Sequence, residues 1–293
     1  MTAEEKNELP LSLFVVHWNQ PLECIATVNA LLNQEVRLKI IIIDNDSKPE
    51  AFQLLESGMN PAIEVVRLTE NKGWGGALNV VLQKWLQAEQ NPYCLISAHD
   101  AMPEPGCVNL LIEAAEANSR IGIACPQYPD HFIARLSALR GVFPERREAQ
   151  PVGTAEQVDV PHGTLMLLRR DCLEQIGLFD ERYFAYGDEH ELGARALRRG
   201  WKVVMVWGAV VTNPGTWTAS PLRSYLFARN SLLLVHDYYG KLSAFIRAFL
   251  ILLNTLRLMI QSPGEAFAFS ARTRFLAVRD FFLGRYGRPD FAG

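Results

Sequence analysis

Cysteine is scarce in this sequence, and its arrangement argues against two kinds of site. The 293 residues contain five cysteines, an odd number, and none of them forms a CxxC pair. Disulfide frameworks need paired cysteines in an oxidising compartment, and structural zinc sites need closely spaced thiolates. We therefore expect neither kind of site, and we expect a reducing, cytoplasmic location.

Several motifs that mark nucleotide and hydrolase sites are also missing. No GxGxxG follows the first apolar run, and the chain has no GxxxxGK[ST], GxSxG or HExxH. The first absence removes support for a dinucleotide-binding fold, and the others remove the P-loop, the nucleophile elbow and the zinc-protease helix.

Charge is distributed unevenly, although the net charge is only −3. Residues 220–293 carry nine arginines and one lysine against four acids, a net charge of +6, so the rest of the chain carries −9. An acidic body joined to a basic, aromatic segment indicates different roles for the two parts. We expect a catalytic domain over 1–240, a helical extension over 241–293, and no nucleic-acid partner.

Short apolar runs alternate with helical patterns over the first 128 residues. The runs are rich in β-branched residues, as buried strands are, and they occupy 11–18, 38–46, 63–68, 93–100 and 121–128. Helical patterns occupy 21–34, 49–57, 74–90 and 105–118. This alternation predicts an α/β fold with a mostly parallel sheet covered by helices on both faces.

The middle of the chain is less regular. Residues 129–158 contain four arginines and no clear period, so we predict a long loop there. Apolar runs at 163–170 and 201–211 predict two further strands, which flank an acidic segment.

Polar residues follow several predicted strands at their carboxyl ends, where open α/β sheets bind ligands. They are His17, Trp18, Asn19, Asp44, Asn45, Asp46, His99, Asp100 and Asn213. Asp46 is better explained as part of a turn or helix cap, whereas Asp44 lies nearer the sheet and is expected to accept hydrogen bonds from a ligand. The adjacent His99 and Asp100 could hold a divalent metal ion.

The stretch ENKGWGGALN, residues 70–79, begins a predicted helix with Gly73, Gly75 and Gly76. Glycine lets the backbone approach another group closely, and a helix N-terminus favours phosphate. A phosphate or a base is therefore one explanation, and a tight turn is the other.

The stretch FAYGDEHELGARALRRGW, residues 184–201, places Asp188, Glu189 and Glu191 at the start of another predicted helix. Acids in a first turn interact favourably with the helix dipole. A cluster of carboxylates can also tune the pKa of a general base. These residues alone leave both explanations open.

Taken in order, these segments resemble the inverting glycosyltransferases of family 2, which have the GT-A fold. The resemblance rests on VVHWN, IIIDNDS, NKGWGGALN, SAHDAMPEPG and GTLMLLRRDCLEQIGLFDERYFAYGDEHELGARALRRG. The last segment is the most specific. It matches the family pattern in type and spacing at Gly177, Phe179, Asp180, Glu181, Phe184, Tyr186, Asp188, Glu189, Glu191, Leu192 and Arg195.

The resemblance implies a reaction and roles for the acid cluster. A sugar would pass from a nucleotide-diphosphate donor to a saccharide hydroxyl with inversion of configuration. Glu189 occupies the position of the family's general base, although most members have Glu-Asp where this chain has Asp188-Glu189. Asp188 and Glu191 would raise the pKa of Glu189 by like-charge repulsion, and Arg195 would orient the cluster.

The resemblance also implies a donor site along the sheet edge. Its predicted residues are Trp18, Asn19, Asp44, Asn71, Lys72, Gly73, Gly76 and Asp100. Asp100 would bind a divalent cation, Mn²⁺ or Mg²⁺, at the diphosphate, with His99 as a second candidate ligand. The chain departs from the family twice here. Ala98 replaces the first acid of the DxD-type motif, and Asn213 stands where many members have a metal-binding histidine.

Two alternatives accompany this hypothesis. A non-catalytic nucleotide-sugar-binding or scaffold subunit is favoured by Ala98 and Asn213. A sugar-phosphate nucleotidyltransferase has a similar fold, but it normally needs a basic, glycine-rich loop after the first strand, and VVHWNQPLE has none. We prefer glycosyl transfer in the synthesis of a cell-surface polysaccharide.

Residues 243–261 predict a helix that is apolar around most of its circumference. At about 100° per residue its polar side chains fall in one stripe, made of Ser243, Arg247, Asn254, Arg257 and Gln261. The two arginines disfavour a membrane span. The helix either packs on the catalytic domain or in a homodimer, or it lies on a membrane whose anionic lipid meets the basic residues. We favour peripheral membrane contact slightly, because a lipid-linked acceptor would require it.

Overall fold

A mostly parallel sheet forms the centre of the computed structural model, which describes residues 10–214, 220–260 and 270–290. The strand order is β3 (Glu64–Arg67), β2 (Leu38–Asp44), β1 (Leu11–His17), β4 (Tyr93–Ala98), β10 (Leu165–Arg169), β6 (Ile121–Gln127), β11 (Lys202–Thr212) and β5 (Met102–Pro103). Neighbours β3, β2, β1 and β4 are parallel, and so are β6 and β11. Strand β10 runs antiparallel to both β4 and β6.

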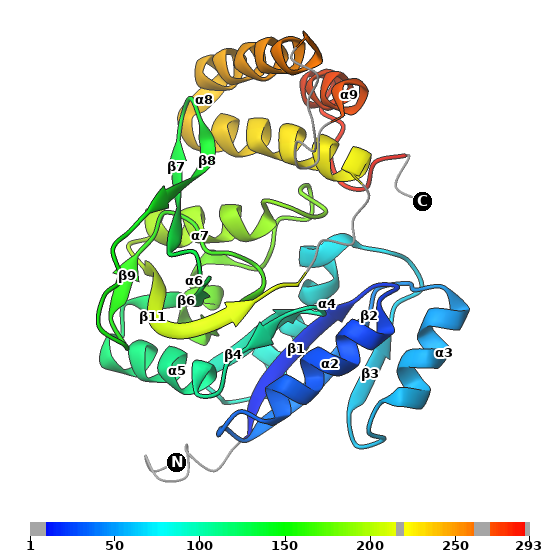
Figure 1. Ribbon diagram of the computed structural model, residues 1–293, viewed down its shortest axis with the longest axis vertical. Helices are drawn as coiled ribbons and strands as arrows, with labels where there is room; N and C mark the ends of the chain where they lie inside the picture. The colour runs from blue at the N-terminus through cyan, green and yellow to red at the C-terminus, as the bar shows by residue number, and fades with distance from the viewer. Residues whose placement is uncertain (1–9, 215–219, 261–269, 291–293) are drawn as a thin grey trace.

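Helices cover both faces of this sheet (Figure 1). Helices α2 (Pro21–Leu32), α3 (Pro49–Gly58) and α5 (Cys107–Ala117) lie on one face, and α4 (Gly73–Ala88), α6 (Arg170–Ile176) and α7 (Asp188–Arg198) lie on the other. Leu13 and Val15 of β1 pack with the first group, while Phe14 and Val16 pack with the second. Since successive side chains of a strand point to opposite faces, continuous apolar runs are needed to fill both cores. The predicted α/β fold class is confirmed.

The loop predicted for residues 129–158 is wrong. Strands β7 (Phe132–Ser137) and β8 (Gly141–Arg146) form an antiparallel hairpin, and β9 (Ala155–Gln157) pairs with β11. Arg135 Nε lies 2.7 Å from Glu145 Oε2, and Arg147 Nε lies 2.6 Å from Glu156 Oε1. The first ion pair joins β7 to β8, and the second joins the residue after β8 to β9. Most residues of β7 and β8 are only partly buried, so these strands lack the apolar alternation that marks a strand in sequence.

The C-terminal part is helical and begins earlier than predicted. Helix α8 (Ser220–Ile260) is broken at Gly240, where φ is 85° and ψ is 174°, and α9 (Ala271–Phe282) follows. A side chain at Gly240 would meet nothing within 4 Å, so glycine is required there by the backbone conformation rather than by space. The break divides α8 into two halves that lie one above the other (Figure 1). The break coincides with the domain boundary predicted between residues 240 and 241, which stays a prediction. Both halves of α8 share one apolar core with α9.

The second half of α8 packs mainly through small and polar side chains, together with Ile251. Ala244, Ala248 and Thr255 are buried, and Arg247 donates to Ser231 Oγ at 3.0 Å and to the Leu139 carbonyl at 3.1 Å. Most of its large apolar side chains face outward, with exposed fractions of 74% for Leu242, 61% for Phe245, 60% for Phe249 and 53% for Leu253. Part of the predicted polar stripe therefore faces the protein, and Gln261 lies outside the described residues. By length and composition Pro221–Ile260 would be able to cross a membrane, but the break at Gly240 interrupts it.

Candidate active site

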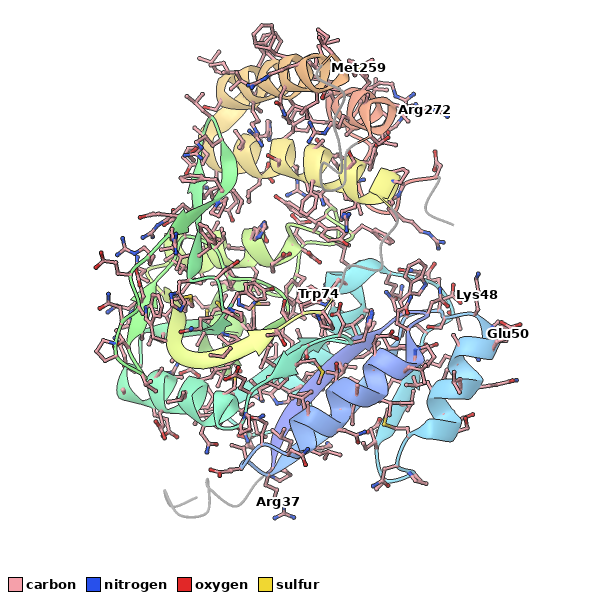
Figure 2. The ribbon with its side chains drawn as sticks, viewed as in Figure 1. Arg37, Lys48, Glu50, Trp74, Met259 and Arg272 are labelled. Atoms are coloured by element: carbon pink, nitrogen blue, oxygen red, sulfur yellow. The ribbon has the colours of Figure 1, made fainter. Side chains whose placement is uncertain are left out.

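A cavity lies beyond the carboxyl ends of β1 and β4, with the first half of α8 along one side. The predicted site residues in its lining are Trp18, Asn71, Gly73, His99, Asp100, Asp188 and Glu189. Asn19, Asp44, Lys72, Gly76 and Glu191 were predicted too, but they are not part of this lining. Figure 2 labels Trp74, another lining residue, between the edge of the sheet and the helical layer.

The glycines of the 70–79 segment allow α4 to approach the loop that precedes α7. The backbone N–H of Trp74 donates to the Phe184 carbonyl at 2.7 Å, and that of Gly75 donates to Asp188 Oδ2 at 2.8 Å. A Cβ atom on Gly73 would lie 1.9 Å from the Phe184 carbonyl oxygen. The group that comes close to this backbone is therefore the chain's own acidic motif. Gly73 also lines the cavity, so its predicted contact with a donor remains open to test.

The loop before α7 is strained and is held by α8. Phe184 and Tyr186 have positive φ values of 66° and 62°, which non-glycine residues adopt only when their surroundings enforce them. Asn230 Nδ2 of α8 lies 2.9 Å from the Tyr183 carbonyl oxygen and 2.7 Å from those of Ala185 and Tyr186. Helix α8 thus fixes the segment that delivers Asp188 and Glu189 to the cavity.

The two adjacent acids of α7 have different surroundings. Asp188 is 1% exposed, and burial, followed by the negative charge of Glu189, raises its pKa well above the usual range for an aspartate. Glu189 accepts a hydrogen bond from the Gly187 N–H at 3.0 Å and lies 3.5 Å from His190 Nε2. Asp188 is thus the buried acid of the pair, with a raised pKa, and Glu189 is the more accessible one, with a side chain that is 14% exposed.

Glu191 is occupied by protein partners. Arg195 Nη2 lies 2.6 Å from Glu191 Oε2, and the Tyr238 hydroxyl donates to Glu191 Oε1 at 2.9 Å. Arg195 also donates to the carbonyls of Ile176 and Leu178. These contacts join α7 to the end of α6 and the segment that follows it. Glu191 and Arg195 therefore have a structural role here.

Asp44 has no exposed surface. Its Oδ1 lies 2.8 Å from His17 Nδ1, and its Oδ2 accepts from the Ser47 N–H. Burial alone would raise its pKa, but the hydrogen bonds from His17 and Ser47 outweigh burial and lower the pKa. The neighbouring Asn45 does line the cavity, where its side chain accepts from the Lys72 N–H and donates to the Gly73 carbonyl.

Three lining residues, His162, Gly163 and Thr164, were not predicted to belong to the site. They precede β10, which is antiparallel to β4, so the amino end of β10 lies at the edge where its neighbour has its carboxyl end. The rule that ligands bind at carboxyl ends of strands cannot find such residues. The signal that could have found them is the PHG turn directly before an apolar run.

The proposed metal ligands include one carboxylate. Asp100 Oδ1 accepts from Asn213 Nδ2 at 3.1 Å, and burial raises the pKa of Asp100 to about 6. His99 Nδ1 donates to the Val16 carbonyl, since a carbonyl can only accept, and the buried Nε2 has no hydrogen-bond partner in the described structure. The described residues contain no cluster of three acids, histidines or cysteines able to hold a metal. This donor set fits a cation that keeps phosphate and water ligands, as Mg²⁺ often does.

Comparison with known proteins decides the family. Residues 9–233 match the sequence model described as Glycosyltransferase like family 2. The chain belongs to this family. It is 24% identical over 212 residues to N-acetylglucosaminyl-diphospho-decaprenol L-rhamnosyltransferase of Mycobacterium tuberculosis, covering 61% of this chain and 67% of that protein. It is 25% identical over 215 residues to the O-antigen biosynthesis protein RfbC of Myxococcus xanthus, covering 66% of this chain and 16% of that protein.

Solved structures show the same fold. The mannosyltransferase PcManGT from Pyrobaculum calidifontis, in complex with GDP-Man and Mn²⁺, has a TM-score of 0.61 at 14% identity, over 95% of this chain and 88% of that one. GalNAc-T7, with UDP, GalNAc and Mn²⁺, has a TM-score of 0.64 at 14% identity, over 94% and 56%. The predicted GT-A fold is confirmed. Membership of this family makes the protein a glycosyltransferase, and neither alternative from the sequence is supported.

Proposed function

We propose that this glycosyltransferase moves a sugar from a nucleotide-diphosphate donor to a saccharide hydroxyl with inversion, and that Glu189 is the general base. The observation that carries the proposal is the pair at the start of α7. Asp188 is buried, raised in pKa and held by the Gly75 N–H, while Glu189 presents a carboxylate at the cavity. Because Asp188 is buried and its raised pKa disfavours the charged form, Glu189 is the member of the pair placed to accept a proton from an acceptor in the cavity.

The reaction needs one bond to form and one to break at the anomeric carbon. The acceptor oxygen attacks this carbon from the side opposite the diphosphate, the bond to the diphosphate oxygen breaks, and the acceptor proton passes to Glu189. Attack from the opposite side inverts the configuration. The fixed position of α7, held by Asn230 through the preceding loop, keeps the base in place.

The donor would occupy the part of the cavity lined by Trp18, Asn45, Asn71, Gly73 and Asp100. Asp100, with Asn213 and His99 beside it, would hold a divalent cation at the diphosphate. Such a cation, when bound, neutralises charge on the leaving diphosphate. Asp44 and Lys72 would support this region from outside the cavity, since Asp44 bonds His17 and Lys72 Nζ lies 2.7 Å from Glu70 Oε1.

The acceptor is proposed to be a lipid-linked saccharide of cell-surface polysaccharide synthesis, met at the inner face of the cell membrane. The name of the mycobacterial relative describes a lipid-linked substrate. In this chain, the exposed apolar side chains of the second half of α8 continue to Phe282, the last residue of α9, and to Leu283, which are 55% and 57% exposed. An apolar face of this extent indicates a partner.

Basic residues around this face favour an anionic membrane as that partner. Exposed basic side chains lie at Lys241, Arg257, Arg272, Arg279 and Arg285. Met259 and Arg272 both lie in the part of the helical layer that is far from the sheet (Figure 2). Interfacial helices combine an apolar side with cations in this way. A second copy of the chain is the competing occupant, and it would carry the same positive charge.

Glu189→Gln tests the catalytic proposal. A screen of nucleotide sugars by thermal shift, with and without Mn²⁺, identifies the donor, and turnover is then measured with that donor. We expect the variant to keep donor binding and to lose about 100-fold or more in kcat, because the amide cannot accept the proton. The control is Glu113→Gln on the exposed side of α5, which should leave turnover unchanged.

Two results would contradict the proposal. Near-normal turnover of Glu189→Gln would remove Glu189 as the base. Binding of a nucleotide sugar by the wild type, without transfer or donor hydrolysis under Mn²⁺ or Mg²⁺, would indicate a non-catalytic subunit.

A further inference from the structure

One wall of the cavity brings His162 close to the proposed base. A Cβ atom on the neighbouring Gly163 would lie 3.2 Å from the ring of Trp74 and 3.7 Å from Glu189 Cγ, so this strand entry, the indole and the base are packed together. The His162 ring stacks on Tyr128, with centroids 4.3 Å apart, and the Tyr128 hydroxyl is hydrogen-bonded to Thr164 Oγ1. These contacts fix the orientation of the imidazole.

The hydrogen bonds of His162 define its tautomer. Nε2 lies 2.7 Å from the Pro126 carbonyl oxygen, and a carbonyl can only accept, so Nε2 carries the proton. Burial lowers the pKa of His162 to about 4, which keeps the ring neutral at physiological pH. Nδ1 is therefore an acceptor, and it is buried without a hydrogen-bond partner among the described residues. A buried acceptor left without a donor is costly, and because His162 lines the cavity, a molecule bound there is one source of the missing donor.

The charges of the cavity indicate whether the molecule that donates to His162 Nδ1 is neutral or anionic. Its lining carries the acids Asp100, Asp188 and Glu189, and no lysine or arginine is found in the lining within the described ranges. An anionic sugar beside Glu189 would be repelled by the carboxylates and would bring no donor from its own carboxylate to the lone pair of His162 Nδ1. A neutral sugar would bring a hydroxyl donor to that lone pair and could stack on Trp74.

We propose that His162 is a specificity-determining residue whose Nδ1 accepts a hydrogen bond from a hydroxyl of a neutral sugar bound beside Glu189, and that uronic acids are excluded from this position. The proposal rests on the proposed function. The sugar that contacts His162 is either the transferred sugar or the acceptor sugar, since either would place hydroxyls near the base. Measuring donor hydrolysis distinguishes the two.

The first test observes the imidazole directly. Protein labelled with ¹⁵N-histidine is titrated with L-rhamnose, N-acetylglucosamine and D-glucuronate, and the His162 nitrogen resonances are assigned with His162→Gln. We expect the Nε2–H tautomer in the free protein and a change in the Nδ1 resonance with a neutral sugar but not with glucuronate. A protonated Nδ1 in the free protein, an equal response to glucuronate, or no response to any sugar would overturn the proposal.

The second test uses two variants that each imitate one ring nitrogen. His162→Gln can still donate to the Pro126 carbonyl but has no acceptor at the Nδ1 position, whereas His162→Asn places an amide oxygen near that position. We expect kcat/KM to fall about tenfold in the first variant and less in the second. His236→Gln is the matched control, because His236 pairs with Asp237 outside the cavity lining.

Donor hydrolysis distinguishes the two sugars. If His162 contacts the transferred sugar, hydrolysis of the donor in the absence of acceptor falls together with transfer. If it contacts the acceptor sugar, transfer falls and hydrolysis is preserved. Equal kcat/KM for His162→Gln and wild type would overturn the proposal while leaving the role of Glu189 intact, because that role is tested separately by Glu189→Gln.

Discussion

The sheet region and the second half of α8 differ in how many large apolar side chains they leave exposed. In the sheet, strand β1 is buried along its whole length, and large exposed apolar residues such as Leu22, Leu54 and Val152 lie on α2, on α3 and in the turn before β9. In the second half of α8, Ala244, Ala248, Thr255 and one large apolar residue, Ile251, are buried, while Phe245, Phe249 and Leu253 are exposed. The surface of the sheet region is suited to water. The exposed face of the second half of α8 is suited to an apolar partner, because a continuous apolar face is costly in water.

The two regions are nevertheless connected at the active site. Asn230, on the first half of α8, donates to backbone carbonyls of the loop that carries Asp188 and Glu189 into the cavity. The helical region therefore has two tasks, since one half positions the catalytic motif and the other half presents an apolar surface. Substitutions in each region should separate these tasks.

The largest expected effect is on membrane binding. Replacing Phe245, Phe249 and Leu253 together by serine should weaken binding to anionic vesicles by about 100-fold, because each exposed side chain loses roughly 1 kcal/mol of transfer free energy. Sedimentation with vesicles at low salt measures this. The matched control replaces Leu22, Leu54 and Val152 by serine and should bind as the wild type does.

The same assay tests whether a membrane or a second copy of the chain covers the exposed apolar face. If the wild type does not bind anionic vesicles at low salt and migrates as a dimer, a second copy covers the apolar face. If it binds, added salt should weaken the binding, because screening shortens electrostatic reach to about 8 Å at physiological ionic strength.

The next effect concerns the connection between the regions. Asn230→Ala removes the donors to three carbonyls, and we expect it to lower the free energy of unfolding by about 3 kcal/mol and to lower kcat, because the strained loop relaxes. Urea denaturation and turnover measure the two quantities. Asn254→Ala, at an exposed position of the same helix, should change neither. An unchanged kcat in Asn230→Ala would show that the loop holds its conformation without α8.

Ion pairs in the two regions should differ in strength. Arg195→Ala removes the cationic partner of the largely buried Glu191 and leaves only the hydrogen bond from Tyr238, so we expect a loss of about 2 kcal/mol in unfolding free energy. Arg279→Ala removes a guanidinium that is about half exposed and should cost less than about 1 kcal/mol. Denaturant midpoints of the two variants provide the comparison, and equal losses would contradict it.

The smallest effect depends on pH. The pKa of Asp100 is raised by burial from 3.8 to about 6, so the stability present below pH 3.8 is lost as the pH rises through 6. Asp100→Asn should therefore stabilise the metal-free protein by about 1 kcal/mol at pH 7.5 and have little effect at pH 3.8. Asp280→Asn in the helical region should not stabilise, because Asp280 accepts from Tyr225 and Arg279. Thermal unfolding at both pH values tests this, and a gain for Asp100→Asn that is equal at both would refute the assignment.

Local sequence patterns were sufficient for much of the fold. Continuous apolar strands predicted a sheet buried on both faces, and the spacing from Gly177 to Arg195 resembled the family that residues 9–233 match. These features are local, since strand burial and helix starts depend on side chains a few residues apart. The same patterns predicted that Asp100, Asp188 and Glu189 share a site, and the structure brings them to one cavity.

Other features depended on contacts between distant segments. The hairpin at 132–146 is stabilised by ion pairs between strands, and the antiparallel direction of β10 moves His162 to the ligand edge of the sheet. The glycines of α4 are explained by the approach of Phe184 and Asp188, which lie more than a hundred residues away in the chain. Helical periodicity located the polar stripe of α8, but periodicity only groups side chains on one face. The protein surface that meets that face decides which side is buried, and here Ser231 and Leu139 receive Arg247 while the apolar side faces outward.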